Sequence, residues 1–183
     1  MKKKSIEELT RTTLEAYRAA AKLPVAVVLD NVRSQNNIGS VLRTADAFLI
    51  EKVVLCGICT PPPSPEIHKT ALGAEDSVAW EYCHDTLAAV ERLRCEGYII
   101  CSIEQVHHSV PLGDFRPDEG KRYALVLGNE VAGVAQEVVD CSDLCLEIPQ
   151  EGTKHSLNIA VTAGIVMWHF YSQMWNFCDE IKL

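Results

Sequence analysis

Short apolar runs, rich in β-branched residues, recur along the chain and alternate with segments of helical spacing. The first run, at residues 25–29, is Val-Ala-Val-Val-Leu and presents no polar side chain to either face. A strand that is apolar on both faces has to be covered on both sides, as strands in parallel sheets are. Strands that alternate with helices are typical of such sheets. We therefore expect an α/β fold, with a mostly parallel sheet flanked by helices.

The other elements follow from the same two periodicities. The pattern predicts further strands at residues 52–56, 78–82, 98–103, 123–127 and 144–148. It predicts helices at residues 5–21, 38–49, 66–72, 86–96, 134–139 and 156–175, and a loop at 107–120. Ser5 and Glu8 form a capping-box pattern in the first helix. We expect one domain at residues 24–183, preceded by a helical extension at residues 1–23.

Charge and hydropathy limit the class of protein. The 183 residues include 25 acidic and 17 basic side chains, and a net charge of −8 argues against coating nucleic acid by bulk charge. The net charge does not exclude a local basic patch. The N-terminal segment is a candidate for one, because it holds Lys2, Lys3, Lys4, Arg11, Arg18 and Lys22. The sequence shows no signal peptide, and no apolar run approaches the ~20 residues of a membrane span. We expect a cytoplasmic protein.

The eight cysteines are expected to be free thiols. Most of them lie inside apolar runs, where a thiol packs as a small hydrophobic group. Cys56 and Cys59 have the spacing of a metal or redox pair, but no second pair follows at zinc-finger spacing. We therefore expect no metal, and a reducing compartment.

Three polar or glycine-containing loops follow predicted strands, at the edge where parallel sheets bind ligands. In the first, Asn37 and Arg43 lie six residues apart, so Arg43 stands on a helix that begins beside Asn37. One interpretation is an arginine that contacts a phosphate or a reacting hydroxyl and is held by Asn37. The other is an asparagine cap and a solvated arginine.

The second loop contains Gly128, Glu130 and Gly133. Gly128 lets a ligand approach the backbone at the end of a strand. Glu130 is placed to anchor another loop or helix. The alternative is a simple glycine turn with an exposed glutamate.

The third loop runs from Ile148 and Pro149 to the Ser156-Leu157-Asn158 segment. Ser156 is a candidate cap for the last helix, which places Asn158 in the first turn, where asparagine needs a partner. An apolar stripe then follows at helical spacing. We expect this stripe to lie in the core or in a dimer interface, and its members are Leu157, Val161, Ile165, Trp168 and Trp175.

Together, the three loops resemble the motifs of the SpoU/TrmH family of RNA 2′-O-ribose methyltransferases, within the SPOUT superfamily. The first resembles the family's Asn-x-Gly-x-x-x-Arg-Thr-Ala motif, from Asn37 to Ala45. The second resembles its Gly-x-Glu-x-x-Gly motif, and the third its Ile-Pro and Ser-Leu-Asn motif. The similarity covers roughly residues 25–171, and the three motifs in this order are highly specific.

The resemblance implies a knotted fold, a cofactor and a partner. In the family, the C-terminal part of the domain is tucked through a loop into a deep trefoil knot, a rare exception among folds. The family is homodimeric and holds S-adenosyl-L-methionine in the knot beside the dimer interface. Carried over to this sequence, the cofactor-binding residues are Ser102, Ile103, Gly128, Ile148, Ser156 and Leu157. The catalytic set is Arg43, Asn37, Glu130, Ser156 and Asn158.

The resemblance further implies methyl transfer from S-adenosyl-L-methionine to a ribose 2′-hydroxyl of RNA. Transfer RNA (tRNA) is favoured over ribosomal RNA (rRNA), because the segment before the first strand is too short for the additional RNA-binding domain of many rRNA enzymes. A guanidinium stays charged in proteins. Arg43 is therefore expected to bind the substrate phosphate and orient the hydroxyl, with a phosphate oxygen or the arginine accepting its proton. Arg33 and Lys154 are further candidate RNA contacts.

Two other classes of protein are weighed against this one. A non-catalytic RNA- or cofactor-binding module of the same fold is expected to lose motif residues, whereas all of them are present. A dinucleotide-binding enzyme is expected to carry Gly-x-Gly-x-x-Gly after its first strand, and the sequence lacks that pattern there.

Overall fold

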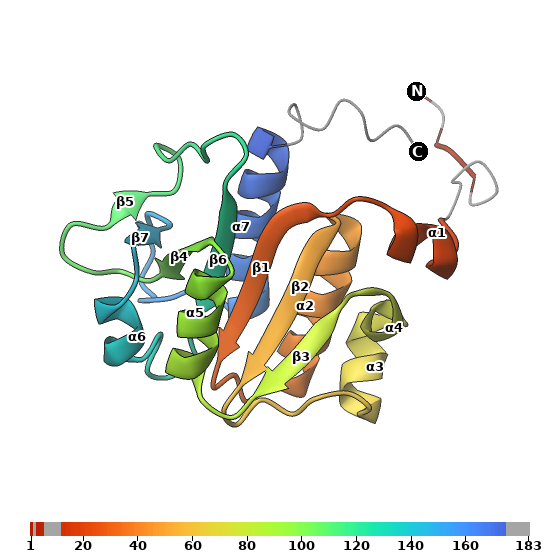
Figure 1. The fold of residues 1–183 in the computed structure, drawn as a ribbon, viewed down its shortest axis with the longest axis horizontal. Helices are drawn as coiled ribbons and strands as arrows, with labels where there is room; N and C mark the ends of the chain where they lie inside the picture. The colour runs from red at the N-terminus through yellow and green to blue at the C-terminus, as the bar shows by residue number, and fades with distance from the viewer. Residues whose placement is uncertain (2, 6–11, 175–183) are drawn as a thin grey trace.

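The computed structural model describes residues 1, 3–5 and 12–174. Within these residues the centre is a sheet of seven strands, all of which pair in parallel (Figure 1). In the order in which they lie side by side, the strands are β3 (Trp80–Cys83), β2 (Ile50–Cys56), β1 (Leu23–Asp30), β6 (Arg122–Leu127), β4 (Tyr98–Ile103), β7 (Leu144–Glu147) and β5 (Val110–Pro111). The predicted parallel α/β sheet is confirmed.

Helices cover both faces of the sheet (Figure 1). One face carries α2 (Gln35–Ala47), α3 (Pro65–Ala71) and α7 (Ile159–Met174), and the other carries α5 (Thr86–Cys95) and α6 (Gln136–Asp140). The residues of β1 show why: Val25, Val27 and Leu29 pack with α2 and α7, whereas Ala26 and Val28 pack with α5 and α6. In the part of the chain described, no helix is long and apolar enough to cross a membrane.

The N-terminal helix is described only in part. The short helix α1 (Leu14–Ala19) lies beside α4 (Ala74–Ser77), where Arg18 Nη2 donates to the carbonyl of Asp76 at 2.5 Å. Tyr17 of α1 is buried in the same hydrophobic cluster as α2 and α7. Residues 6–11, including Glu8 of the predicted capping box, lie outside the described residues, as does Trp175 of the predicted apolar stripe.

Two helices begin at other residues than the sequence predicts, and their caps explain why. Ser34 Oγ accepts from the backbone N–H of Asn37 at 3.3 Å, so α2 begins at Gln35 and Asn37 lies in its first turn. Asn158 Oδ1 accepts from the N–H of Ala160 at 2.9 Å, so α7 begins after Asn158 and Ser156 is not its cap. The predicted loop at 107–120 also contains β5, which pairs with β7.

The strand order creates a switch point beside β1. The chain moves from β1 outward to β2 and β3, and it places β6, β4, β7 and β5 on the other side of β1. Connections that leave neighbouring strands in opposite directions open a crevice at the carboxyl ends of those strands. The three motif loops follow strands at this edge, so the fold brings them to one place.

Helices α2 and α3 approach each other at Gly39, and this contact gives a stability test. A Cβ at Gly39 would overlap the carbonyl oxygen of Ile67 and Oγ1 of Thr70. We expect Gly39→Ala to lower the free energy of unfolding by ~1–3 kcal/mol in urea titration, because α3 has to move away. The control is Gly113→Ala, where no described heavy atom lies within 4 Å. Equal stability of both variants would contradict the prediction.

Candidate functional site

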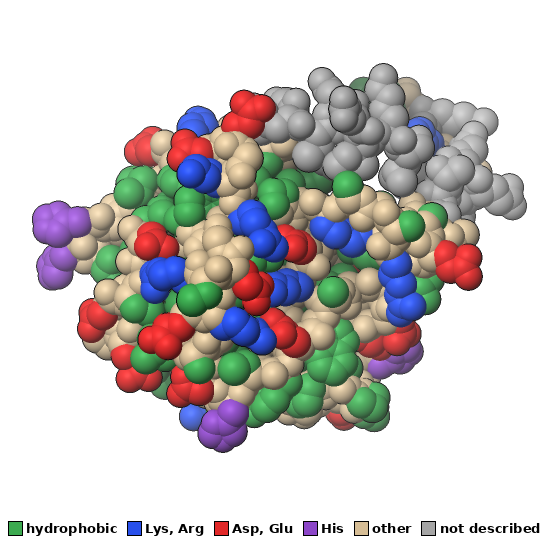
Figure 2. Space-filling model, viewed as in Figure 1, with side chains coloured by type: hydrophobic (Ala, Val, Ile, Leu, Met, Phe, Trp, Pro, Cys, Tyr) green, Lys and Arg blue, Asp and Glu red, His purple; other side chains and the backbone are tan. Residues whose placement is uncertain are grey.

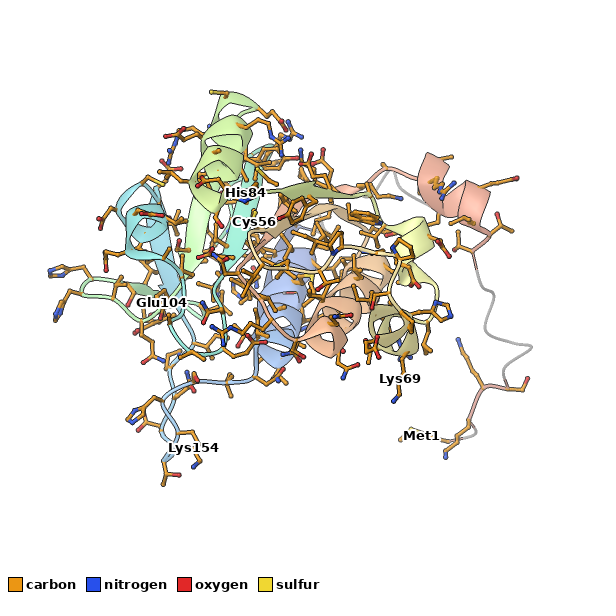
Figure 3. The ribbon with its side chains drawn as sticks, turned by 90° about the horizontal axis from the view of Figure 1, so that it is seen from below. Met1, Cys56, Lys69, His84, Glu104 and Lys154 are labelled. Carbon is orange, nitrogen blue, oxygen red and sulfur yellow. The ribbon has the colours of Figure 1, made fainter. Side chains whose placement is uncertain are left out.

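A cavity of about 490 Å³ opens at the carboxyl ends of β4, β6 and β7, beneath the first turn of α7. Its walls come from the second and third motif loops and from the end of β4, and no residue of the first motif loop lines it. The predicted site residues that line it are Ile103, Gly128, Glu130, Ile148, Ser156, Leu157 and Asn158. Glu104, Gln105, Asn129 and His155 also line it, and Figure 3 shows Glu104 beside these loops.

A chain of polar side chains joins the three loops. Asn37 Nδ2 donates to Glu130 Oε1 at 3.0 Å, and Asn158 Nδ2 donates to Asn37 Oδ1 at 3.3 Å. The backbone N–H groups of Arg33 and Ser34 add longer bonds to the same carboxylate, each at 3.4 Å. Side chains that lie 93 and 121 residues apart in sequence are therefore in direct contact.

Asn37 does not hold Arg43, which corrects one interpretation of their spacing. The amide of Asn37 bonds to Glu130 and Asn158 instead. Six residues of α-helix separate the two side chains by ~9 Å along the axis and turn them to different sides of α2. Arg43 is exposed and is not among the residues that line the cavity of its own chain.

Three other predicted residues also lie away from the cavity wall. Ser102 is fully buried, and its Oγ is 2.7 Å from Oγ of Ser142. Neighbouring residues of a strand face opposite sides, so Ile103 lines the cavity and Ser102 does not. Arg33 and Lys154 are exposed, and Lys154 lies at the tip of the loop between β7 and α7 (Figure 3).

The loop after β6 is a closed turn that only glycine permits at two positions. A Cβ on Gly128 would overlap the backbone of Gly133, and Gly133 has φ +72°. Asn129 Oδ1 accepts from the N–H groups of Val131 and Ala132, each at 2.8 Å. Sequence reasoning did not single out Asn129, although an asparagine between Gly128 and Glu130 is a known turn signal.

The cysteine pair is buried and protonated. Cys56 and Cys59 are both buried, and desolvation raises their pKa values to about 12 and about 11. Cys59 Sγ donates to the carbonyl of Leu29 at 3.3 Å and accepts from the N–H of Val32 at 3.2 Å. Among the described residues, no group of three or more His, Cys, Asp or Glu side chains is arranged to hold a metal ion.

The fold and the cavity define an α/β protein whose parallel sheet carries a cavity at the carboxyl ends of β4, β6 and β7. The model of the SpoU rRNA Methylase family matches residues 24–168. The chain belongs to this family.

Named relatives share the domain. The 23S rRNA (guanosine-2′-O-)-methyltransferase RlmB of Nitrosomonas europaea is 30% identical over 155 residues, which are 80% of this chain and 55% of that protein. An rRNA methyltransferase of Sinorhizobium meliloti, solved with AdoMet bound, gives a TM-score of 0.75 at 27% identity, over 87% of this chain and 59% of that one. A third protein, solved to study the 2-OH methylation of C/U34 on tRNA, gives a TM-score of 0.71 at 27% identity. The match covers 81% of this chain and 95% of that one.

Most of these relatives are longer than this chain. It spans 61% of the TrmH-family relative from Staphylococcus saprophyticus and 62% of those from Staphylococcus epidermidis and Staphylococcus haemolyticus.

The Glu130 carboxylate gives a pH dependence of definite sign. Desolvation raises its pKa, but hydrogen bonds from its own backbone, from Asn37, and from the N–H groups of Arg33 and Ser34 outweigh this, so the pKa lies below its usual 4.5. A carboxyl with a lowered folded-state pKa contributes stability above its ordinary pKa and loses it as the pH falls through the folded value.

We therefore expect Glu130→Gln to unfold at lower urea concentration than the wild type near neutral pH. The difference should shrink as the pH is lowered below 4.5. Glu91→Gln, on the exposed surface of α5, is the matched control for removal of one negative charge. A wild-type advantage over Glu130→Gln that stayed constant throughout this pH range would rule out the assigned role of the carboxylate.

Proposed function

We propose that the chain transfers a methyl group from S-adenosyl-L-methionine to a ribose 2′-hydroxyl of RNA. The observation that carries this proposal is the convergence of three distant loops: the second and third line one cavity, and Asn37 joins the first to them through Glu130 and Asn158. The names of the relatives support it, since one is a guanosine 2′-O-methyltransferase and another was solved with AdoMet bound.

The cavity has the size and chemistry that this cofactor needs. Its volume of about 490 Å³ lies within the range of pockets for ligands of this size. Ile103, Leu146 and Leu157 provide aliphatic walls, and Gly128 also lines the cavity, with the backbone of Gly133 packed where its side chain would be. When bound, S-adenosyl-L-methionine supplies a methyl group that is already activated by the sulfonium. Ile148 and Ser156 complete the proposed cofactor set, and Ser102 would act only by supporting Ile103.

The protein's own contribution is alignment and charge. Arg43 would bind the phosphate beside the target ribose, orient the 2′-hydroxyl and favour the developing alkoxide. A phosphate oxygen or the arginine itself would accept the hydroxyl proton. Glu130 and Asn158 hold Asn37, and with it the first turn of the helix that carries Arg43.

A homodimer built on α7 is part of the proposal. Val161, Ile165 and Trp168 are 51%, 38% and 54% exposed, so this stripe is not core within one chain. Leu157, at the start of the stripe, is 38% exposed and also lines the cavity. A partner seated on α7 would therefore lie against the cavity.

The trefoil knot and the compartment complete the proposal. Strand β7 pairs with β4 and β5, and the chain then returns across the sheet to α7, which packs on α2. This return path is the segment that a family-type knot would thread. The buried thiols of Cys56 and Cys101 suit a reducing cytoplasm.

Transfer RNA is the favoured substrate. This chain matches 95% of the solved relative that was studied for methylation on tRNA. A domain of nearly the same length is therefore associated with tRNA in that relative. Ribosomal RNA is the second candidate, because RlmB of Nitrosomonas europaea is named for 23S rRNA. Incubating the protein and labelled S-adenosyl-L-methionine with tRNA or rRNA, followed by mapping of 2′-O-methylation, separates the two. Binding without transfer to either would favour a non-catalytic module.

The charge distribution makes the face that carries α5 and α6 a poor surface for RNA. Figure 2 shows basic and acidic side chains interspersed on the face that carries α5 and α6. Lys52 pairs with Glu96 at 2.8 Å, and Arg122 pairs with Glu51 at 2.7 Å. Paired cations of this kind attract a phosphate backbone poorly. We therefore assign the RNA contacts to Arg33, Arg43 and Lys154.

Replacement of Arg43 separates chemistry from cofactor binding. We expect Arg43→Ala to abolish methyl transfer, because alignment and charge stabilisation are both lost, while the calorimetric Kd for S-adenosyl-L-methionine stays near that of the wild type. Arg92→Ala removes an exposed arginine from α5 as the matched control and should keep its turnover. Wild-type turnover by Arg43→Ala would remove Arg43 from the mechanism.

The proposed interface is tested by a charge on α7. We expect Trp168→Glu to shift the protein from dimer to monomer in sedimentation velocity, because a buried, unpaired carboxylate disfavours association. Ile58→Glu, at another apolar side chain of similar exposure (55%), is the control and should leave the dimer intact. A wild-type protein that sediments as a monomer at all concentrations would exclude the dimer.

A further inference from the structure

A buried carboxylate lies directly behind the loop that follows β6. Asp30, the last residue of β1, is 1% exposed. Its Oδ1 accepts from Asn31 Nδ2 at 2.8 Å and from Thr86 Oγ1 at 2.6 Å, and its Oδ2 accepts from the N–H of Ala135 at 2.9 Å. A carboxylate is buried only where such bonds compensate it, so the three donors fix its position.

A second carboxylate holds the same loop from the other side. Glu104 follows β4, and its Oε2 accepts from the N–H of Val134 at 3.0 Å, while its Oε1 accepts from the N–H of Gln105 at 2.9 Å. Strand β6 lies between β1 and β4 in the sheet. Asp30 and Glu104 therefore hold two consecutive backbone amides, Ala135 and Val134, from the two strands that flank β6.

The held amides belong to the wall of the cavity. Asn129 and Gly133 exchange two backbone hydrogen bonds, each at 3.1 Å, and the backbone of Gly133 contacts Gly128. A shift of Val134 would therefore displace Gly133 and Gly128, which both line the cavity. It would also displace Glu130, which carries the bond to Asn37.

We propose that Asp30 is a positioning residue for the cofactor: it does not line the cavity, and it holds the cavity wall in place through the backbone of Ala135. This inference rests on the proposed function, because it takes the cavity as the S-adenosyl-L-methionine site. Glu104 shares the task but also lines the cavity, so Asp30 is the cleaner position for a test.

The principal variant is Asp30→Asn, which keeps the size of the side chain. Two donors face Oδ1 and one faces Oδ2, so the amide oxygen takes the Oδ1 position and the NH2 group meets the N–H of Ala135. We expect the Kd for S-adenosyl-L-methionine to rise about tenfold, with a much smaller change in kcat at saturating cofactor. Amide exchange should accelerate at residues 131–135 and stay unchanged in β6.

Two further variants separate positioning from general stability. Thr86→Val removes one bond to the same carboxylate and leaves the Ala135 contact, so its Kd should stay within about twofold of the wild type. Ala135→Pro removes the donor instead of the acceptor, and the φ of −56° at Ala135 suits proline. Its Kd should rise as in Asp30→Asn, and the double variant should bind no more weakly than the singles, because both remove the same contact.

The outcomes distinguish this inference from the proposed function. A wild-type protein that does not bind S-adenosyl-L-methionine overturns the proposed function itself. A wild type that binds, with Asp30→Asn and Ala135→Pro binding equally well or with additive effects in the double variant, overturns only the role of Asp30. If Asp30→Asn does not fold, Ala135→Pro decides the matter alone: unchanged affinity and unchanged amide exchange there overturn the inference.

Discussion

Glu130 accepts hydrogen bonds from the side chain of Asn37 and from the backbone of Arg33 and Ser34, so this one carboxylate joins the cavity wall to the first motif loop. The bonds fasten the loop after β6 to the first turn of α2. Asn37 then accepts from Asn158, which caps α7. Hydrogen bonds to an ionised group are stronger than those between neutral partners. An ionised glutamate at this position therefore holds the loop after β6, the first turn of α2 and the start of α7 in fixed relative positions.

The strand order decides which segments can meet in this way. Strands β1, β6, β4 and β7 lie side by side, although they come from widely separated parts of the sequence. Their carboxyl ends lie at one edge. The loops that leave β1, β6 and β7 are the motif loops, and the segment that follows β4 adds Glu104 to the cavity wall. The contacts among these loops span 93 and 121 residues. Contacts of such sequence separation carry a large loop-closure cost, so we expect the cavity to form only once the sheet has assembled.

Local signals predicted the strands and helices well, because each apolar run carries its own periodicity. The first strand is the clearest case, since residues 25–29 have to be buried on both faces and are. Helix starts were less predictable, because two capping residues compete at each. Asn37 and Ser34 both suit a cap, and the distant Glu130 engages the side chain of Asn37, which leaves Ser34 as the cap of α2. No local pattern contains that information.

The site was predictable as a set of loops but not as a geometry. Spacing placed Arg43 near Asn37 in sequence, but could not tell which side of α2 each side chain faces. The role of Asp30 was hidden for a related reason. In the sequence, Asp30 follows an apolar run and indicates only the start of a polar loop. Its partners Thr86 and Ala135 lie 56 and 105 residues away.

The two outer strands of the sheet have a further consequence. Strand β3 has four residues and β5 has two, so each edge exposes only a short row of unpaired backbone groups. Long, flat edges recruit strands from other molecules and lead to aggregation. This sheet offers little template for such growth at either side. Two copies of the chain would therefore associate through their helices rather than by pairing edge strands. On a helical surface, the shapes of the side chains decide which partner fits.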